Sequence, residues 1–178
     1  MKISKNNILK LSILLSIICF FSLNIFSNNT FNRISLDTTQ NNLYTISSGT
    51  EKFLKNIDEP IHLRLFMSST LVEIAPQLST YANRVESLLY SYANMSEGKI
   101  TLEIIDPKPF SDQEDRAVGM GISPFGGSNN NDPLYFGLAA TNSTTGQKNI
   151  NVFSPEREPF LEYDLTRLIA ELAQTKKP

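Results

Sequence analysis

Apolar residues concentrate first in a run near the start of the chain. Residues 11–27 contain no charged side chain, and Lys2, Lys5 and Lys10 precede them. A run of this length approaches the ~20 apolar residues that a helix needs to cross a bilayer. Because basic residues stay on the cytoplasmic side, residues 1–10 are expected inside the cell and the remainder outside its membrane. The pattern therefore predicts a single-pass anchor in the inner (cytoplasmic) membrane and an extracytoplasmic domain.

A cleaved signal peptide is the alternative for the same run, with residues 11–23 as its apolar core. No site of small residues suited to cleavage follows this core. Cys19 is preceded by Ile18, where a lipoprotein signal has a small residue. We therefore favour an uncleaved anchor, followed by a polar, partly extended linker over residues 28–47.

A folded α/β domain is predicted over residues 48–178. Ser48 and Glu51 match a capping box, which predicts a short helix over residues 50–56. Apolar and polar side chains then alternate over Ile61–Met67, which predicts a strand with one face buried.

Helical spacing of apolar residues resumes after this strand. The stripe from Leu78 to Tyr92 predicts a helix that begins near Pro76 and ends near Gly98, a residue suited to a left-handed cap. The remaining predicted elements are a strand over residues 99–105, a short helix from the capping box Ser111–Glu114 to Met120, an irregular loop over 121–133, strands over 134–141 and 147–153 joined by a hairpin, and a terminal helix over 161–172.

The order of these elements, strand-helix-strand-helix-strand-strand-helix, indicates a mixed sheet with helices on both faces. The first two strands are joined through a helix and should be parallel, whereas the last two are joined by a tight turn and should be antiparallel. This order is typical of a three-layer or thioredoxin-like sandwich, here following a transmembrane helix. Pro133 precedes the third strand, where that fold often has a cis-proline. A flavodoxin-like or amidotransferase-like α/β layer is the alternative.

Composition removes several classes of function. The chain has 178 residues, a net charge of −2, one histidine and one cysteine. Since Cys19 lies in the predicted anchor, the exported domain has no thiol, and His62 lacks a cysteine or second histidine as a partner. No Gly-rich phosphate-binding motif occurs, and the acidic balance disfavours nucleic acid. We expect no cofactor, no metal and no enzymatic activity.

Acidic and aromatic residues cluster where strands give way to helices, the ends at which α/β sheets present binding crevices. A hydrolase would have to pair Asp106 with Glu114 or Asp115, and nothing in their spacing selects that chemistry. Docking of a protein, peptide or glycan is the stronger interpretation. The candidate docking residues are Asp106, Pro107, Pro109, Phe110, Glu114, Asp115, Tyr135, Phe136, Glu162, Tyr163 and Asp164.

Several motifs in fixed order resemble a known family. They are Arg33–Asp37, Asn42–Ser47, Ile104–Phe110 (IIDPKPF), Glu114–Asp115, Tyr135–Leu138 (YFGL) and Phe160–Ile169 (FLEYDLTRLI). Together they resemble the GldG-like auxiliary component of gliding-motility-type ABC transport systems.

This resemblance implies a bacterial, non-catalytic subunit whose partners are an ABC permease and an ATPase. The ATP chemistry would belong to the partner. Members of that family are usually longer, so the chain is expected to be a fragment, the product of a split gene or a shortened relative. A free-standing, envelope-anchored peptide- or glycan-binding module is the alternative function.

Overall fold

A computed structural model describes residues 15–16, 20, 46–126 and 132–174 of the chain. The chain divides into two compact units, Met1–Asn42 and Leu43–Pro178. Most of the predicted anchor over residues 11–27, and most of the linker over 28–47, lie outside the described residues. Within the described part of the chain, no helix combines the length and apolarity needed to cross a bilayer. The membrane anchor stays a prediction.

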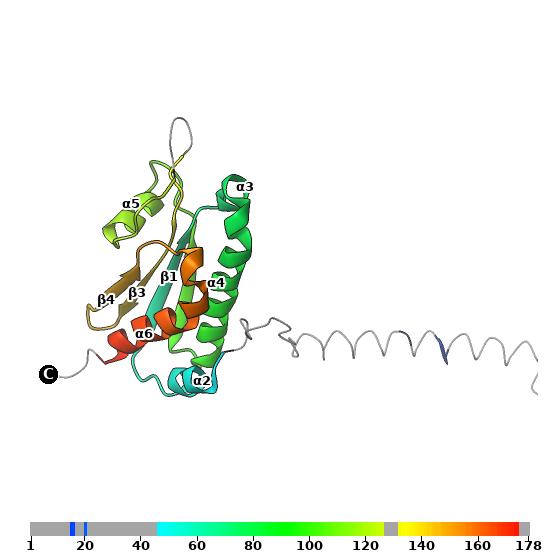
Figure 1. The fold of residues 1–178 in the computed structure, drawn as a ribbon. Coiled ribbons are helices and arrows are strands. Elements are labelled where there is room, and N and C mark those ends of the chain that lie inside the picture. The colour runs from blue at the N-terminus through cyan, green and yellow to red at the C-terminus, as the bar shows by residue number, and fades with distance from the viewer. Residues whose placement is uncertain (1–14, 17–19, 21–45, 127–131, 175–178) are drawn as a thin grey trace, which may run out of the picture. The chain divides into compact units, whose positions relative to one another are not determined.

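The second unit is built on one mixed sheet of four strands (Figure 1). The strand order is β2-β1-β3-β4. β1 pairs parallel with β2 and antiparallel with β3, and β3 pairs antiparallel with β4, so both predicted strand pairings are confirmed. The strands are β1 (Ile61–Met67), β2 (Ile100–Ile105), β3 (Phe136–Asn142) and β4 (Gln147–Ile150).

Helices connect and cover the strands in the predicted order. Two elements were not predicted: the one-turn helix α3, which precedes α4, and the 3₁₀ segment η1, which precedes α6. The helical elements are α2 (Ser48–Lys55), α3 (Leu71–Ile74), α4 (Pro76–Met95), α5 (Asp112–Gly119), η1 (Pro155–Phe160) and α6 (Leu161–Ala173).

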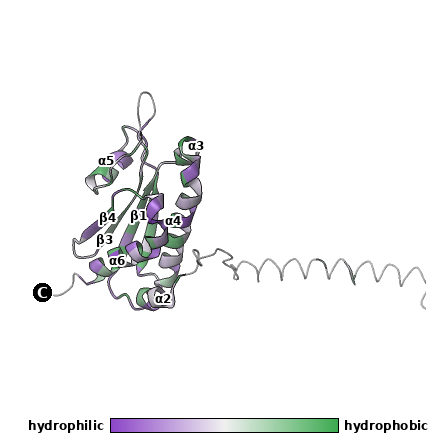
Figure 2. Cartoon of the chain, viewed as in Figure 1, coloured by the Kyte–Doolittle hydropathy of each residue, from purple (hydrophilic) through white to green (hydrophobic). Residues whose placement is uncertain are grey.

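Two hydrophobic cores lie on opposite faces of the sheet. The larger one joins the sheet to α2, α4 and α6. The smaller one lies beneath α5 and consists of Phe66, Ile105, Ala117, Ile122, Tyr135 and Ala139. Figure 2 shows hydrophobic residues along β1 and β3, whereas β4 is hydrophilic. The prediction of a single buried face for β1 was therefore incomplete, because Phe66 is buried on the other face.

The helix caps correct one prediction and confirm another. The N-cap of α2 is Ser47 rather than Ser48, and its side chain accepts a hydrogen bond from the Thr50 N–H. The N-cap of α5 is Ser111, as predicted, and its hydroxyl accepts from the Glu114 N–H. Cap hydroxyls satisfy N–H groups that have no partner within the helix, so these serines fix where each helix begins.

Strand boundaries differ from the pattern by one to three residues. β3 begins at Phe136 rather than at residue 134, and β4 ends at Ile150 rather than at residue 153. Gly98 has a φ of +86°, which confirms the left-handed cap expected after α4. No peptide bond among the described residues is cis, so Pro133 lacks the cis bond that a thioredoxin-like fold often has at this place.

Candidate functional site

The predicted docking residues with the most connected geometry lie around the ends of β1 and β2, which α3 and α5 follow in the chain. Asp106 follows β2, and its Oδ1 accepts a hydrogen bond of 2.9 Å from the N–H of Ser69, just after β1. The neighbouring Ser68 is only 4% exposed. Its N–H donates to the Tyr135 carbonyl, and its hydroxyl accepts from the Tyr135 N–H, both at 2.9 Å. These bonds fasten the ends of β1 and β2 to the chain that enters β3.

Glu114 connects three parts of this region. Its Oε1 accepts a 2.8 Å hydrogen bond from the Tyr135 hydroxyl, and its Oε2 accepts a 2.7 Å bond from the Phe110 N–H. Its own N–H donates to Ser111 Oγ. Burial, reinforced by the Glu114 carboxylate, raises the pKa of Tyr135 to about 12. The phenol therefore stays protonated at physiological pH and acts as a donor to Glu114.

The turn before α5 presents an aromatic ring to solvent. Phe110 has a φ of +60°, a left-handed conformation that is unusual for a residue with a bulky side chain. Its ring is fully exposed, with a relative exposure of 102%. The turn is fixed by Ser111, whose hydroxyl and N–H both donate to the Lys108 carbonyl. A rigid turn therefore carries a ring that makes no packing contribution of its own.

We name this region the strand-end cluster, defined as Ser68, Ser69, Asp106, Phe110, Glu114 and Tyr135. Pro107 is buried and Pro109 is half-buried within the turn, while Asp115 is exposed on the first turn of α5. Negative charge is favoured at that position by the helix dipole. The structure thus brings together the predicted docking residues from Asp106 to Tyr135.

A second group of predicted residues lies elsewhere, at the start of α6. Glu162 Oε1 accepts hydrogen bonds from the Ser47 N–H at 3.0 Å and from the Thr50 hydroxyl at 2.6 Å. Asp164 binds both Nε and Nη2 of Arg157, at 2.9 and 2.7 Å. We name these five residues the helix-start cluster. Tyr163, between its two carboxylates, is 62% exposed.

The electrostatics of Glu162 reflect its structural contacts. Burial favours its neutral form, but the hydrogen bonds from Thr50 and Ser47 outweigh burial and lower its pKa below the usual 4.5. The carboxylate is therefore ionised while it holds the start of α2 against α6.

One predicted docking residue lies in the larger hydrophobic core. Phe136 has no exposed surface and lies in the larger core, where its ring packs edge-on against Tyr81 at a centroid distance of 5.8 Å. Phe136 cannot touch a partner, and we correct the predicted surface by removing it. Tyr135 (2% exposed) and Pro107 are also buried, so they support the surface from within and do not contact a partner. Sequence reasoning also missed Ser68 and Ser69, although two hydroxyl residues directly after an apolar strand were a usable signal.

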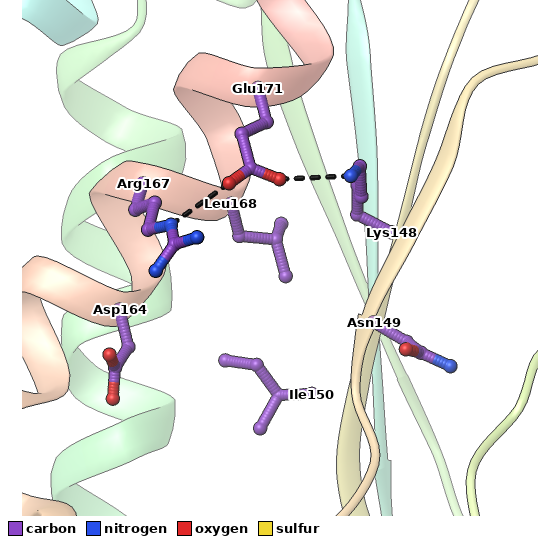
Figure 3. A pocket seen from close by; sticks show the side chains of 7 residues that line it. All are labelled: Lys148, Asn149, Ile150, Asp164, Arg167, Leu168 and Glu171. Carbon is purple, nitrogen blue, oxygen red and sulfur yellow. Dashed lines mark hydrogen bonds and ion pairs between the residues drawn. The ribbon is translucent and has the colours of Figure 1, made fainter.

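A pocket of about 210 Å³ lies between β4 and α6 (Figure 3). Figure 3 shows Glu171 between two cations, with one oxygen 2.9 Å from Lys148 Nζ and the other 2.9 Å from Arg167 Nε. These cations lower the pKa of Glu171. Of the predicted residues, only Asp164 lines the pocket. Its charges are largely compensated by one another, so it offers little to an ionic ligand.

The two central carboxylates of the strand-end cluster are engaged within the fold. Asp106 and Glu114 accept hydrogen bonds from groups of their own chain, which leaves neither as an isolated acid or base. Among the described residues, no three His, Cys, Asp or Glu side chains lie close enough together to hold a metal ion. His62, exposed on β1, lies with its Nδ1 2.6 Å from Thr101 Oγ1.

Comparisons with known proteins give one match. A family model described as a domain of unknown function (DUF7088) matches residues 40–141, which is more than half of the chain. No curated protein and no solved structure matches the chain. The matched region includes α2 and the strand-end cluster but ends before β4 and α6. The chain therefore belongs to the DUF7088 family.

Proposed function

We propose that this protein is a non-catalytic, membrane-anchored auxiliary subunit of a GldG-like, gliding-motility-type ABC transporter. Residues 11–27 anchor it in the inner membrane, and the α/β domain lies outside the cytoplasm. The domain docks a permease, which carries out transport together with its ATPase. The support is the order of motifs in the sequence, the basic residues before the apolar run, and the geometry of the strand-end cluster.

The observation that carries the proposal is the presentation of Phe110. An aromatic ring that is fully exposed on a strained, hydrogen-bonded turn gains nothing from its own fold. Strained residues persist at functional sites because the surrounding structure holds them there. Aromatic anchors contribute much of the energy at protein interfaces. Phe110 is therefore the residue that contacts the permease.

We propose further that the domain is a thioredoxin-like sandwich. In support, the strand order is β2-β1-β3-β4, β1 and β2 are parallel, and α5 covers the face opposite α4 and α6. A flavodoxin-like layer would need a parallel third strand, whereas β3 is antiparallel to β1. No Cys-x-x-Cys motif occurs in the sequence, which has one cysteine, so the sandwich acts as a scaffold for docking.

Co-purification of the full chain with its transporter tests the function. The affinity-tagged chain is expressed in its native host and extracted in mild detergent. Phe110→Ser should reduce permease recovery on the order of 30-fold, because losing an interface anchor costs about 2 kcal/mol. Tyr163, although a predicted docking residue, lies on α6 and outside the strand-end cluster, so this proposal assigns it no part in docking. Tyr163→Ser should therefore leave recovery unchanged.

Two outcomes would overturn the proposal. One is a chain that recovers neither permease nor ATPase. The other is equal loss of permease in the Phe110 and Tyr163 variants with unchanged melting temperatures. Binding of cell-wall glycan or peptide fragments by a chain that recovers no transporter would instead favour the free-standing binding module.

A further inference from the structure

β2 forms one edge of the sheet, and half of its backbone groups point away from β1. The Ile61 N–H donates to the Lys99 carbonyl, which sets the alternation of the parallel ladder. Residues 99, 101, 103 and 105 therefore face β1, whereas Leu102 and Ile104 direct their N–H and C=O groups outward. Within the described residues, these outward groups of Leu102 and Ile104 have no hydrogen-bond partner.

β2 has few of the features that normally keep an edge strand from pairing with another chain. Natural edges carry charges, prolines or bulges, or are very short, and these features discourage pairing with another chain. β2 has six residues, ITLEII, and its only charge is Glu103. That carboxylate is already bound by Arg64 at 3.2 Å and Arg116 at 3.5 Å. Ile104 beside it is 37% exposed.

The opposite edge, β4, is protected. It has only four residues, and Lys148 at its centre binds Glu171 of α6. The side chains of Gln147 and Asn149 donate to the Met120 carbonyl, so the turn after α5 is tied to this strand. The two edges of one sheet therefore differ in their readiness to accept another strand.

We propose that β2 pairs antiparallel with β2 of a second copy of this chain, about a two-fold axis through Leu102. A two-fold interface brings the same patch of both copies together, so the strand must be complementary to itself. In this register Leu102 faces Leu102 of the second copy, and Ile100 faces Ile104. The outward N–H and C=O groups of Leu102 are exchanged between the copies, and the Ile104 N–H meets the Ile100 carbonyl.

The side-chain pairs of this register identify a second copy as the occupant. Thr101 of each strand faces Glu103 of the other, so a hydroxyl meets a carboxylate and no like charges are opposed. His62 Nδ1 lies 2.6 Å from Thr101 Oγ1, and in the tautomer that carries a proton on Nδ1 the Thr101 hydrogen is available for that carboxylate. The apolar face of the joined strands continues the larger core, against which Leu102 already packs.

Disulfide crosslinking of the full chain in its native membrane tests the register. Cys19→Ser removes the single native thiol, and Leu102→Cys then introduces one at the axis. Cα atoms of a hydrogen-bonded antiparallel pair lie about 5.5 Å apart, which a disulfide can span. Mild oxidation should give a covalent dimer. The matched variant Lys148→Cys on the β4 edge should stay monomeric.

A charge placed on the edge tests the interface without a covalent bond. Ile104→Lys should weaken self-association of the detergent-extracted chain on the order of tenfold or more, measured by light scattering across a dilution series. Ile74→Lys changes an isoleucine of similar exposure (44%) on α3 and should leave the association unchanged. Circular dichroism checks that both variants fold.

Each remaining outcome decides against the proposal. The proposal is overturned by a monomeric wild-type chain, by a dimer that survives Ile104→Lys, or by crosslinking of Leu102→Cys only to a different protein. The last outcome would mean that β2 receives a heterologous strand. These experiments measure self-association of the chain, whereas the docking test measures permease recovery. Self-association through β2 and docking through Phe110 can therefore fail independently of each other.

Discussion

The two acidic clusters have similar composition and different roles. In the helix-start cluster, Glu162 binds Ser47 and Thr50, more than a hundred residues earlier in the chain, and Asp164 is neutralised by Arg157. In the strand-end cluster, Glu114 binds the nearby Phe110 N–H and the Tyr135 hydroxyl. The first arrangement closes the fold, whereas the second shapes a turn that exposes an aromatic ring.

This difference shows why residue type alone does not mark a docking surface. Carboxylates beside aromatic residues occur in both segments, and the sequence pattern treats them alike. What separates them is where the hydrogen bonds go. A carboxylate with distant partners has a folding role, and its loss should lower stability; a carboxylate that holds a strained, exposed turn should affect binding as well.

Glu162→Ala should have the largest effect on stability. It removes acceptors for the Ser47 N–H and for the largely buried Thr50 hydroxyl, which lies at 7% exposure. Because charge-assisted hydrogen bonds of this kind are lost together, the free energy of unfolding should fall by about 2 kcal/mol. Thermal unfolding of the full chain in detergent measures it. Permease recovery from the folded fraction should be unchanged. A selective loss of recovery would mean that the helix-start cluster also takes part in docking.

Tyr135→Phe should have an intermediate effect and should act on both properties. It removes the donor at 2.8 Å from Glu114 Oε1 without changing the ring that packs in the smaller core. We expect a loss of about 1.5 kcal/mol in the free energy of unfolding and a measurable fall in permease recovery. If stability falls and docking does not, Glu114 has a purely structural role.

Phe110→Gly should separate stability from docking. Glycine accepts the φ of +60° without strain, so the free energy of unfolding should rise by about 0.5–1 kcal/mol. Permease recovery should nevertheless be lost with the ring. Thr145→Gly, at a φ of +73° in the β3–β4 turn, is the matched control and should stabilise the chain while docking persists. A destabilised Phe110→Gly chain would contradict the account of strain.

Glu162→Gln should have the smallest effect of these substitutions, seen as a change in how the melting temperature falls at acid pH. Because the folded-state pKa of Glu162 lies below 4.5, its stabilisation is present above that pH and is lost as pH falls through the lowered pKa. Glu162→Gln should therefore flatten the loss of melting temperature below pH 4.5. Glu51, Glu156 and Glu171, whose pKa values are also lowered, should cause a residual loss in both proteins.

The sequence predicted the elements better than the site. Alternation over Ile61–Met67 and helical spacing after Pro76 are local signals, because each element buries the face that its own period defines. The hydroxyl of Ser111 likewise marks its helix start locally. Two adjacent serines compete for the start of α2, and spacing could not show that Ser47 is the cap.

The site depended on contacts that no local pattern carries. Alternation of side chains along a strand does not show which face of β3 is exposed to solvent, and in the structure both faces are covered. Phe136 was therefore predicted on the surface, although it lies in the core. The partners of Glu162 are distant in sequence and become neighbours only when α2 and α6 pack. The full exposure of Phe110 follows from a left-handed turn, which composition does not reveal.

Site-specific photocrosslinking in living cells tests the docking role of the strand-end cluster most directly. A photoreactive phenylalanine analogue replaces Phe110 in one full-length chain and Tyr163 in another, and each chain is irradiated in the native membrane. The account predicts a covalent product with the permease from position 110 and none from position 163. A permease product from position 163 alone, or from neither position, would contradict it.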